Sequence, residues 1–235
     1  IFFMKIGVPK EIKPQESRIG LTPESVKELV SNGHEVLVEN NGGHEAGFDN
    51  SHYSSAGAKI VDKSEDIFND SEIIVKVKEP LSSEVKMIKE NQIVFTYLHL
   101  AAAKELTQGL INSKGICIAY ETVTDQNGRL PLLAPMSAVA GRMSVQAGAH
   151  CLEKNQKGRG LLLGGAPGVE GGTVVILGGG VVGENAAIIA TGMQAKVYIV
   201  DKSEKRLGEL NQKFGDKIIP QQSDNIDLKK LISEA

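Results

Sequence analysis

Short apolar runs rich in Ile and Val alternate with helix-like segments from Met4 to about Pro131. The runs predict six strands, at Lys5–Val8, Glu35–Glu39, Lys59–Val61, Glu72–Val77, Gln92–Leu98 and Ile116–Glu121. The clearest helix is predicted at Pro23–Asn32, because Thr22 is a favourable N-cap and Gly33 a favourable C-terminal residue. A further helix is predicted at Ala102–Ser113. Strands that alternate with helices in this way are typical of a mostly parallel sheet.

A second pattern begins near Pro131–Pro135. A long helix is predicted at about Ser137–Lys154, and a glycine-rich loop at 157–172 follows it. Small residues in this helix would let another element approach closely; they are Ala138, Ala140, Gly141, Ala147 and Gly148. We therefore predict two α/β domains, residues 1–133 and 134–235, each doubly wound and Rossmann-like with a mostly parallel sheet, the second incomplete.

The second domain carries the pattern G-x-G-x-x-G directly after an apolar strand, Thr173–Leu177. A helix at Glu184–Met193 and a strand at Lys196–Val200 are predicted to follow it. In this context the pattern indicates a dinucleotide site. Its first glycine permits a tight turn, its second lets the backbone approach a pyrophosphate, and its third lets the helix lie close to the strand. The residues of the turn that we expect to bind the cofactor are Gly178, Gly180, Val181, Val182 and Gly183.

An acidic residue, Asp201, follows Gly183 by 18 residues, at the end of the second strand. A carboxylate at this position accepts hydrogen bonds from an adenosine ribose and repels a 2′-phosphate. The cofactor predicted is therefore NAD rather than NADP, although the adjacent Lys202 weakens that preference. The alternative is that the turn is simply a glycine-rich surface loop.

Three polar residues of the first domain follow predicted strands: Arg18, Lys78 and His99. Because the carboxyl ends of parallel strands share one edge of a sheet, we expect the three to converge on one crevice. Arginine binds a carboxylate with two hydrogen bonds, lysine polarises an oxygen, and histidine moves protons near neutral pH. Each residue also has a structural alternative: Arg18 as a solvated loop charge, Lys78 as a strand-end ion pair with Lys76 as its competitor, and His99 as a core histidine.

Composition narrows the possible partners. The chain has 235 residues, of which 41% are hydrophobic and 23% charged, as in ordinary globular proteins. A net charge of −3 without a basic block argues against nucleic acid as a partner, and no apolar run approaches the length of a membrane span. Cys117 and Cys151 form no metal-binding pair, and the histidines show no ligand spacing, so we predict no metal and a cytoplasmic location.

Several separated motifs, in the same order, resemble the alanine dehydrogenases within the wider alanine dehydrogenase and nicotinamide nucleotide transhydrogenase family. The likeness covers nearly the whole chain from Met4. The segments that carry it are Gly7–Glu11, Glu16–Arg18, Lys76–Pro80, Phe95–Ala102, Leu132–Ser137 and Ile176–Asp201. His99 separates the branches of the family, because transhydrogenase subunits differ in the segment around it.

The resemblance implies reversible, NAD-dependent oxidative deamination of L-alanine to pyruvate and ammonia. It further implies that Arg18 and Lys78 bind the carboxylate and the oxygen of pyruvate, that His99 is the acid–base group, and that Ser137 contacts the cofactor. The glycine turn and Asp201 would hold NAD, and the protein would be a homo-oligomer, by resemblance a hexamer.

The chain stops at Ala235, whereas members of the family continue further. We therefore expect a fragment that lacks half of the nucleotide domain and is inactive alone. Alternative functions are a transhydrogenase alpha-type subunit, a related reductive aminase of the saccharopine group, and a non-catalytic NAD-binding module. The last would need the glycine turn and Asp201 but neither Arg18 nor His99.

Overall fold

The computed structural model describes residues 3–233 and residue 235. The chain divides into two compact units, one ending at Leu130 and the other beginning at Pro131. Each unit is an α/β structure with its own parallel sheet and its own core. The predicted fold class is thereby confirmed.

The first unit is built on a six-stranded sheet in the order β3-β2-β1-β4-β5-β6, with every neighbouring pair parallel. Its strands are β1 (Lys5–Val8), β2 (Glu35–Glu39), β3 (Lys59–Val61), β4 (Ile73–Val75), β5 (Ile93–Thr96) and β6 (Ile116–Ala119). In this doubly wound order the chain reverses direction across the sheet between β1 and β4. Ligands of open parallel sheets bind outside the carboxyl ends of the strands at such a point.

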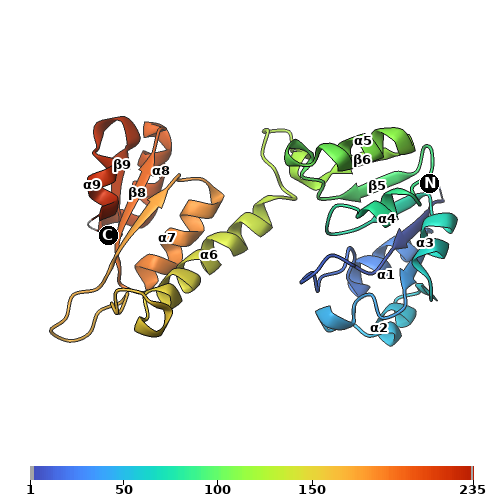
Figure 1. Ribbon diagram of the computed structural model, residues 1–235, viewed down its shortest axis with the longest axis horizontal. Helices are drawn as coiled ribbons and strands as arrows, with labels where there is room; N and C mark the ends of the chain where they lie inside the picture. The colour runs from blue at the N-terminus through green and yellow to red at the C-terminus, as the bar shows by residue number, and fades with distance from the viewer. Residues whose placement is uncertain (1–2, 234) are drawn as a thin grey trace. The chain divides into compact units, whose positions relative to one another are not determined.

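Helices cover both faces of this sheet (Figure 1). They are α1 (Pro23–Ser31), α2 (Asn50–Ser55), α3 (Ser64–Asp70), α4 (Ser82–Val85) and α5 (Lys104–Ser113). Successive residues of β2 face opposite cores: Val36 packs with Val26 of α1 and Tyr53 of α2, whereas Leu37 packs with Phe68 of α3. The two cores explain why these strands are apolar at nearly every position.

The second unit has a three-stranded parallel sheet in the order β7-β8-β9. Its elements are α6 (Ala134–Cys151), β7 (Thr173–Leu177), α7 (Val181–Gly192), β8 (Lys196–Asp201), α8 (Glu204–Phe214), β9 (Ile219–Gln222) and α9 (Leu228–Ser233). Helix α6 packs along α7 (Figure 1). The contact is close because Gly141 of α6 has no side chain: a Cβ there would lie 2.1 Å from the Val182 carbonyl oxygen.

Several predicted element ends were wrong. Strands β4, β5 and β6 stop at Val75, Thr96 and Ala119, earlier than predicted. Beyond the ends of β4 and β5 the backbone N–H groups bond to side-chain carboxylates, those of Val77 and Lys78 to Glu11 and those of Leu98 and His99 to Glu121. At these positions a side-chain carboxylate, rather than a neighbouring strand, accepts the backbone hydrogen bond.

Two helices also begin earlier than predicted. Helix α6 starts at Ala134 and includes Pro135 in its first turn. Proline is tolerated there because the N–H groups of the first turn have no partner within the helix. Helix α7 starts at Val181 rather than at Glu184, with Gly180 as its N-cap. The glycine turn is therefore shorter than predicted, and Val181 and Val182 already belong to the helix.

Candidate functional site

The three polar residues predicted at the strand ends lie on the carboxyl side of the first sheet, in the loops after β1, β4 and β5. Tyr97 links two of them. Its ring stacks on that of His99, with 6.1 Å between the centroids and an interplanar angle of 11°. Burial raises the pKa of the Tyr97 phenol, and the nearby positive charge of Arg18 opposes that rise. Lys78 belongs to the same group, because its positive charge is close enough to Glu16 to help lower the pKa of that carboxyl.

Arg18 is held in a fixed orientation by Glu16. The Arg18 Nε donates to Glu16 Oε1 at 2.7 Å, and Nη2 donates to Oε2 at 2.6 Å. The Arg18 backbone N–H bonds to the same carboxylate at 3.0 Å. These bonds lower the pKa of the Glu16 carboxyl and raise that of the guanidinium, so both groups stay charged. The Arg18 side chain remains 46% exposed, and thus accessible to a ligand, whereas that of Glu16 is only 7% exposed.

Lys76, the competitor considered for Lys78, is a structural residue. Its side chain is 1% exposed, and its ammonium pairs with Glu11 at 3.2 Å and Glu84 at 2.7 Å. Glu11 also accepts hydrogen bonds from the backbone N–H groups of Val77 and Lys78, at 2.6 and 3.3 Å. The buried network thus holds the backbone of Lys78, whose own side chain is half-buried and lies at the sheet edge.

His99 is exposed, so the alternative of a core histidine does not hold. Its backbone is in the left-handed region, with φ 51° and ψ 38°, which non-glycine residues seldom adopt. Its N–H donates to Glu121 Oε1 at 2.7 Å. The first unit therefore gathers two cations and a histidine at one edge, a set suited to binding and protonating a small carboxylate ligand.

The glycine turn of the second unit has the geometry that its spacing predicts. Gly178 has φ +96°, a conformation that favours glycine. A Cβ at Gly183 would lie 1.9 Å from the Gly178 carbonyl oxygen, so only glycine allows α7 to start this close to the strand. At Gly180 a Cβ would meet nothing within 4 Å. The backbone is thus open to a ligand at the N-terminus of a 12-residue helix, where N–H groups favour phosphate.

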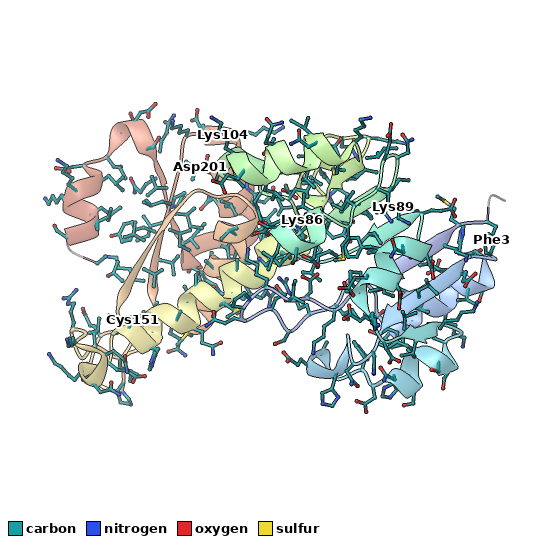
Figure 2. All side chains as sticks on the ribbon, turned by 45° about the vertical axis from the view of Figure 1, so that its right-hand side comes forward. Phe3, Lys86, Lys89, Lys104, Cys151 and Asp201 are labelled. Atoms are coloured by element: carbon teal, nitrogen blue, oxygen red, sulfur yellow. The ribbon has the colours of Figure 1, made fainter. Side chains whose placement is uncertain are left out.

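Asp201, labelled in Figure 2, ends β8 and faces the turn. Its Oδ2 accepts from the Gly179 N–H at 2.6 Å and its Oδ1 from the Ser203 N–H at 2.8 Å. Hydrogen bonds from Ser203 and Gly179 lower the pKa of this carboxyl. Asp201 therefore anchors the turn as an anion.

Arg206 of α8 was not predicted. Its Nε donates to the Gly179 carbonyl oxygen at 2.6 Å, and its Nη2 pairs with Glu184 of α7. It thereby joins α8, the glycine turn and α7. The sequence shows only a basic residue in the first turn of the helix after Asp201. Its partners could not be predicted from this, because they lie more than 20 residues away in the chain.

A cavity of about 720 Å³ lies between α6, α7 and β7 of the second unit. It brings together the predicted cofactor residues other than Asp201; these are Ser137, Gly178, Gly180, Val181, Val182 and Gly183. An open backbone turn, a helix N-terminus and an anchored carboxylate together fit a dinucleotide.

Within residues 3–233 and 235 no cluster of three or more His, Cys, Asp or Glu side chains is arranged to hold a metal ion. In the same part of the chain, no helix combines the length and the apolar character that a membrane span requires.

Comparison with known proteins gives consistent matches. Residues 7–140 match the family model "Alanine dehydrogenase/PNT, N-terminal domain", and residues 144–235 match its C-terminal counterpart. An alanine dehydrogenase of Halomonas elongata is 53% identical over 211 residues, which are 90% of this chain and 57% of that protein. The chain thus spans less than two thirds of this relative's length.

Solved structures give the same pattern. An L-alanine dehydrogenase superimposes with a TM-score of 0.92 at 51% identity, covering 99% of this chain and 64% of that one. A transhydrogenase from Sinorhizobium meliloti superimposes with a TM-score of 0.75 at 22% identity, covering 92% of this chain and 64% of that one. The second match concerns the fold alone.

Proposed function

Because this chain belongs to the alanine dehydrogenase/PNT family, we propose that its protein is an alanine dehydrogenase: an oxidoreductase that reversibly converts L-alanine to pyruvate and ammonia with NAD. The observation that carries the proposal is the gathering of Arg18, Lys78 and His99 at the carboxyl edge of the first sheet. The first unit would bind the substrate and the second the cofactor.

Each residue of the first unit has a role that follows from its surroundings. Arg18, held by Glu16, binds the substrate carboxylate through its exposed guanidinium. Lys78 binds the oxygen at C2 of pyruvate and favours the negative charge that develops there. His99 gives and takes the protons that imine formation and hydrolysis require. Fixing the substrate in this way is chiefly a positioning effect.

A nicotinamide nucleotide, when bound, supplies the hydride acceptor for alanine oxidation and the hydride donor for the reverse reaction. Gly178, Gly180 and Gly183, the first turn of α7 and Ser137 would hold it, because they line the cavity of the second unit. Asp201 favours NAD over NADP, since an anion at this position repels a 2′-phosphate. The proposal further includes a cytoplasmic homo-oligomer, hexameric by family resemblance, that acts on small molecules and neither on nucleic acid nor at a membrane.

The test follows NADH consumption with pyruvate and ammonium, using the protein at the full length of its reading frame. Consumption that requires both co-substrates is expected. Arg18→Ala should raise the KM for pyruvate roughly 10²-fold, the cost of an unpaired charge, while NADH affinity stays unchanged. His99→Ala should mainly lower kcat. Lys27→Ala, at an exposed position of α1, is the matched control and should change neither constant.

Tight NADH binding without pyruvate-dependent consumption would overturn the proposal and favour an NAD-binding module or a transhydrogenase-type role. Loss of pyruvate and NADH affinity together in Arg18→Ala would indicate misfolding rather than a lost carboxylate site.

A further inference from the structure

Glu121 lies in the 3₁₀ turn that follows β6, at the same sheet edge as His99. Its carboxylate accepts the backbone N–H of His99 at 2.7 Å and that of Leu98 at 3.1 Å, both through Oε1, and its Oε2 lies 3.3 Å from the Leu98 N. Two consecutive N–H groups thus converge on one anion, as they do in backbone sites that bind phosphate or carboxylate ligands.

The contact holds a residue with an unusual backbone conformation. At φ 51° and ψ 38° the residue occupies the left-handed region, which persists in a non-glycine residue only where the surroundings enforce it. The residue follows β5, which ends at Thr96, and is the N-cap of the 3₁₀ turn Leu100–Ala102. Its backbone therefore sets the direction in which the imidazole leaves the sheet edge. Removal of the Glu121 carboxylate would free residue 99 to relax to an ordinary conformation.

Glu121 itself is not suited to proton transfer. Burial raises the pKa of its carboxyl, but hydrogen bonds from the backbone of His99, of Glu121 itself and of Leu98, with the nearby His99 ring, lower it overall. The group therefore stays ionised and occupied by N–H donors. Its contribution to the site must pass through the residues that it holds.

We propose that Glu121 is a positioning residue that fixes the backbone of His99, and with it the imidazole, in the orientation needed for proton transfer. The proposal rests on the proposed function, in which His99 is the acid–base group. It adds a residue 22 positions away in the sequence that acts through the backbone of His99.

The first test compares Glu121→Gln with Glu28→Gln in the protein at the full length of its reading frame. Glu28 is exposed on α1 and serves as the matched control. Glu121→Gln removes the negative charge and replaces one of the two oxygens by an NH2 group, which cannot accept from an N–H, so the three contacts to Leu98 and His99 cannot all be kept. We expect kcat to fall by about 10²-fold, as for a misplaced catalytic group, while the KM for NADH and the thermal midpoint change little. Glu28→Gln should behave as wild type.

The second test separates positioning from a general structural role. In the His99→Ala background Glu121→Gln should lower kcat by less than about twofold, because the residue through which it acts is gone. An additive loss in the double variant, or wild-type kcat in the single one, would overturn the proposal.

A third readout does not depend on activity. Bound to a carboxylate, the His99 amide proton should resonate downfield and exchange slowly, and Glu121→Ala should reverse both properties. An unchanged His99 amide would overturn the positioning role even if alanine turnover is found. If wild-type turnover is absent, the proposed function fails, while the amide still reports whether Glu121 fixes residue 99.

Discussion

Replacement by alanine should have opposite effects on stability at two glycines of the same helix. Gly141 and Gly148 both lie within α6, but Gly141 is buried against α7 and Gly148 is exposed. A Cβ at Gly141 would lie 2.1 Å from the Val182 carbonyl oxygen and 2.9 Å from the Cβ of Asn185, whereas one at Gly148 would meet nothing within 4 Å. Alanine at these two positions therefore separates helix propensity from packing.

The magnitudes follow from these contacts. Replacing a glycine by alanine inside a helix stabilises it by about 1 kcal/mol, and at Gly148 nothing opposes that gain. At Gly141 the same gain is set against overpacking, which costs about 1–3 kcal/mol in well-packed cores. The obstacle is backbone on a neighbouring helix, so α6 and α7 must move apart and the upper end of that range applies. We expect Gly148→Ala to stabilise the second unit and Gly141→Ala to destabilise it by about 1–2 kcal/mol.

Thermal denaturation followed by circular dichroism measures both variants against wild type. For a unit of this size 1 kcal/mol shifts the midpoint by about 4–8 °C, so the two variants should melt well apart. Hydrogen exchange should locate the change in Gly141→Ala to the amides of α6 and α7. Equal midpoints for the two variants would refute the argument that the missing side chain of Gly141 sets the spacing of these helices.

Three further predictions concern charged groups. Lys76→Met leaves two buried carboxylates without their cation, so urea denaturation should show a loss of about 3–5 kcal/mol. The control Lys86→Met, at the exposed C-cap of α4 and labelled in Figure 2, should lose less than about 0.5 kcal/mol, and equal losses would contradict a buried network. Hydrogen bonds from Lys213 and Arg206 lower the pKa of Glu184, so the ionised carboxylate stabilises the fold at pH values above its ordinary pKa of 4.5, and this effect is lost as the pH falls through the pKa of the folded state. Glu184→Gln should therefore lower stability at pH 7 and flatten the acid dependence of stability in urea titrations, and an unchanged pH profile would contradict the assignment. Asp201→Ala removes the acceptor of the Gly179 N–H, so calorimetry should show the affinity for NADH reduced tenfold or more. An unchanged affinity would contradict the role of Asp201 as the anchor of the turn.

Local patterns were enough to predict the strands and the positions of the polar residues that follow them. β1, β2 and β3 lie where the apolar runs predict, because a strand buried on both faces is apolar at nearly every position. The turn between β7 and α7 could likewise be predicted from the spacing of its glycines, because each glycine is needed for a local feature of the backbone. Helices of four to seven residues, such as α3 and α4, are too short to show a helical period and were not predicted individually.

Contacts between distant residues could not be predicted. Glu11 bonds to the backbone of Val77, 66 positions away, and Glu121 to that of His99, 22 positions away. No spacing rule marks such a carboxylate, since its partner is a backbone N–H that every residue but proline carries. Both carboxylates bond to the backbone just beyond the ends of β4 and β5.

These carboxylates also explain how the site keeps its shape before a ligand arrives. Glu16 binds the guanidinium of Arg18, Glu11 the backbone of Lys78 and Glu121 the backbone of His99, so each of the three predicted site residues is held by an anion. Glu16 lies in the same loop as Arg18, whereas Glu11 and Glu121 come from distant stretches of the chain. In two of the three cases the hydrogen bonds are to the backbone, which leaves the ammonium of Lys78 and the imidazole of His99 available to the proposed substrate. Groups fixed in this way lose little conformational freedom on binding and need not reorganise when charge develops. The cost falls on folding instead, which must bury Glu11 and keep His99 in a left-handed conformation.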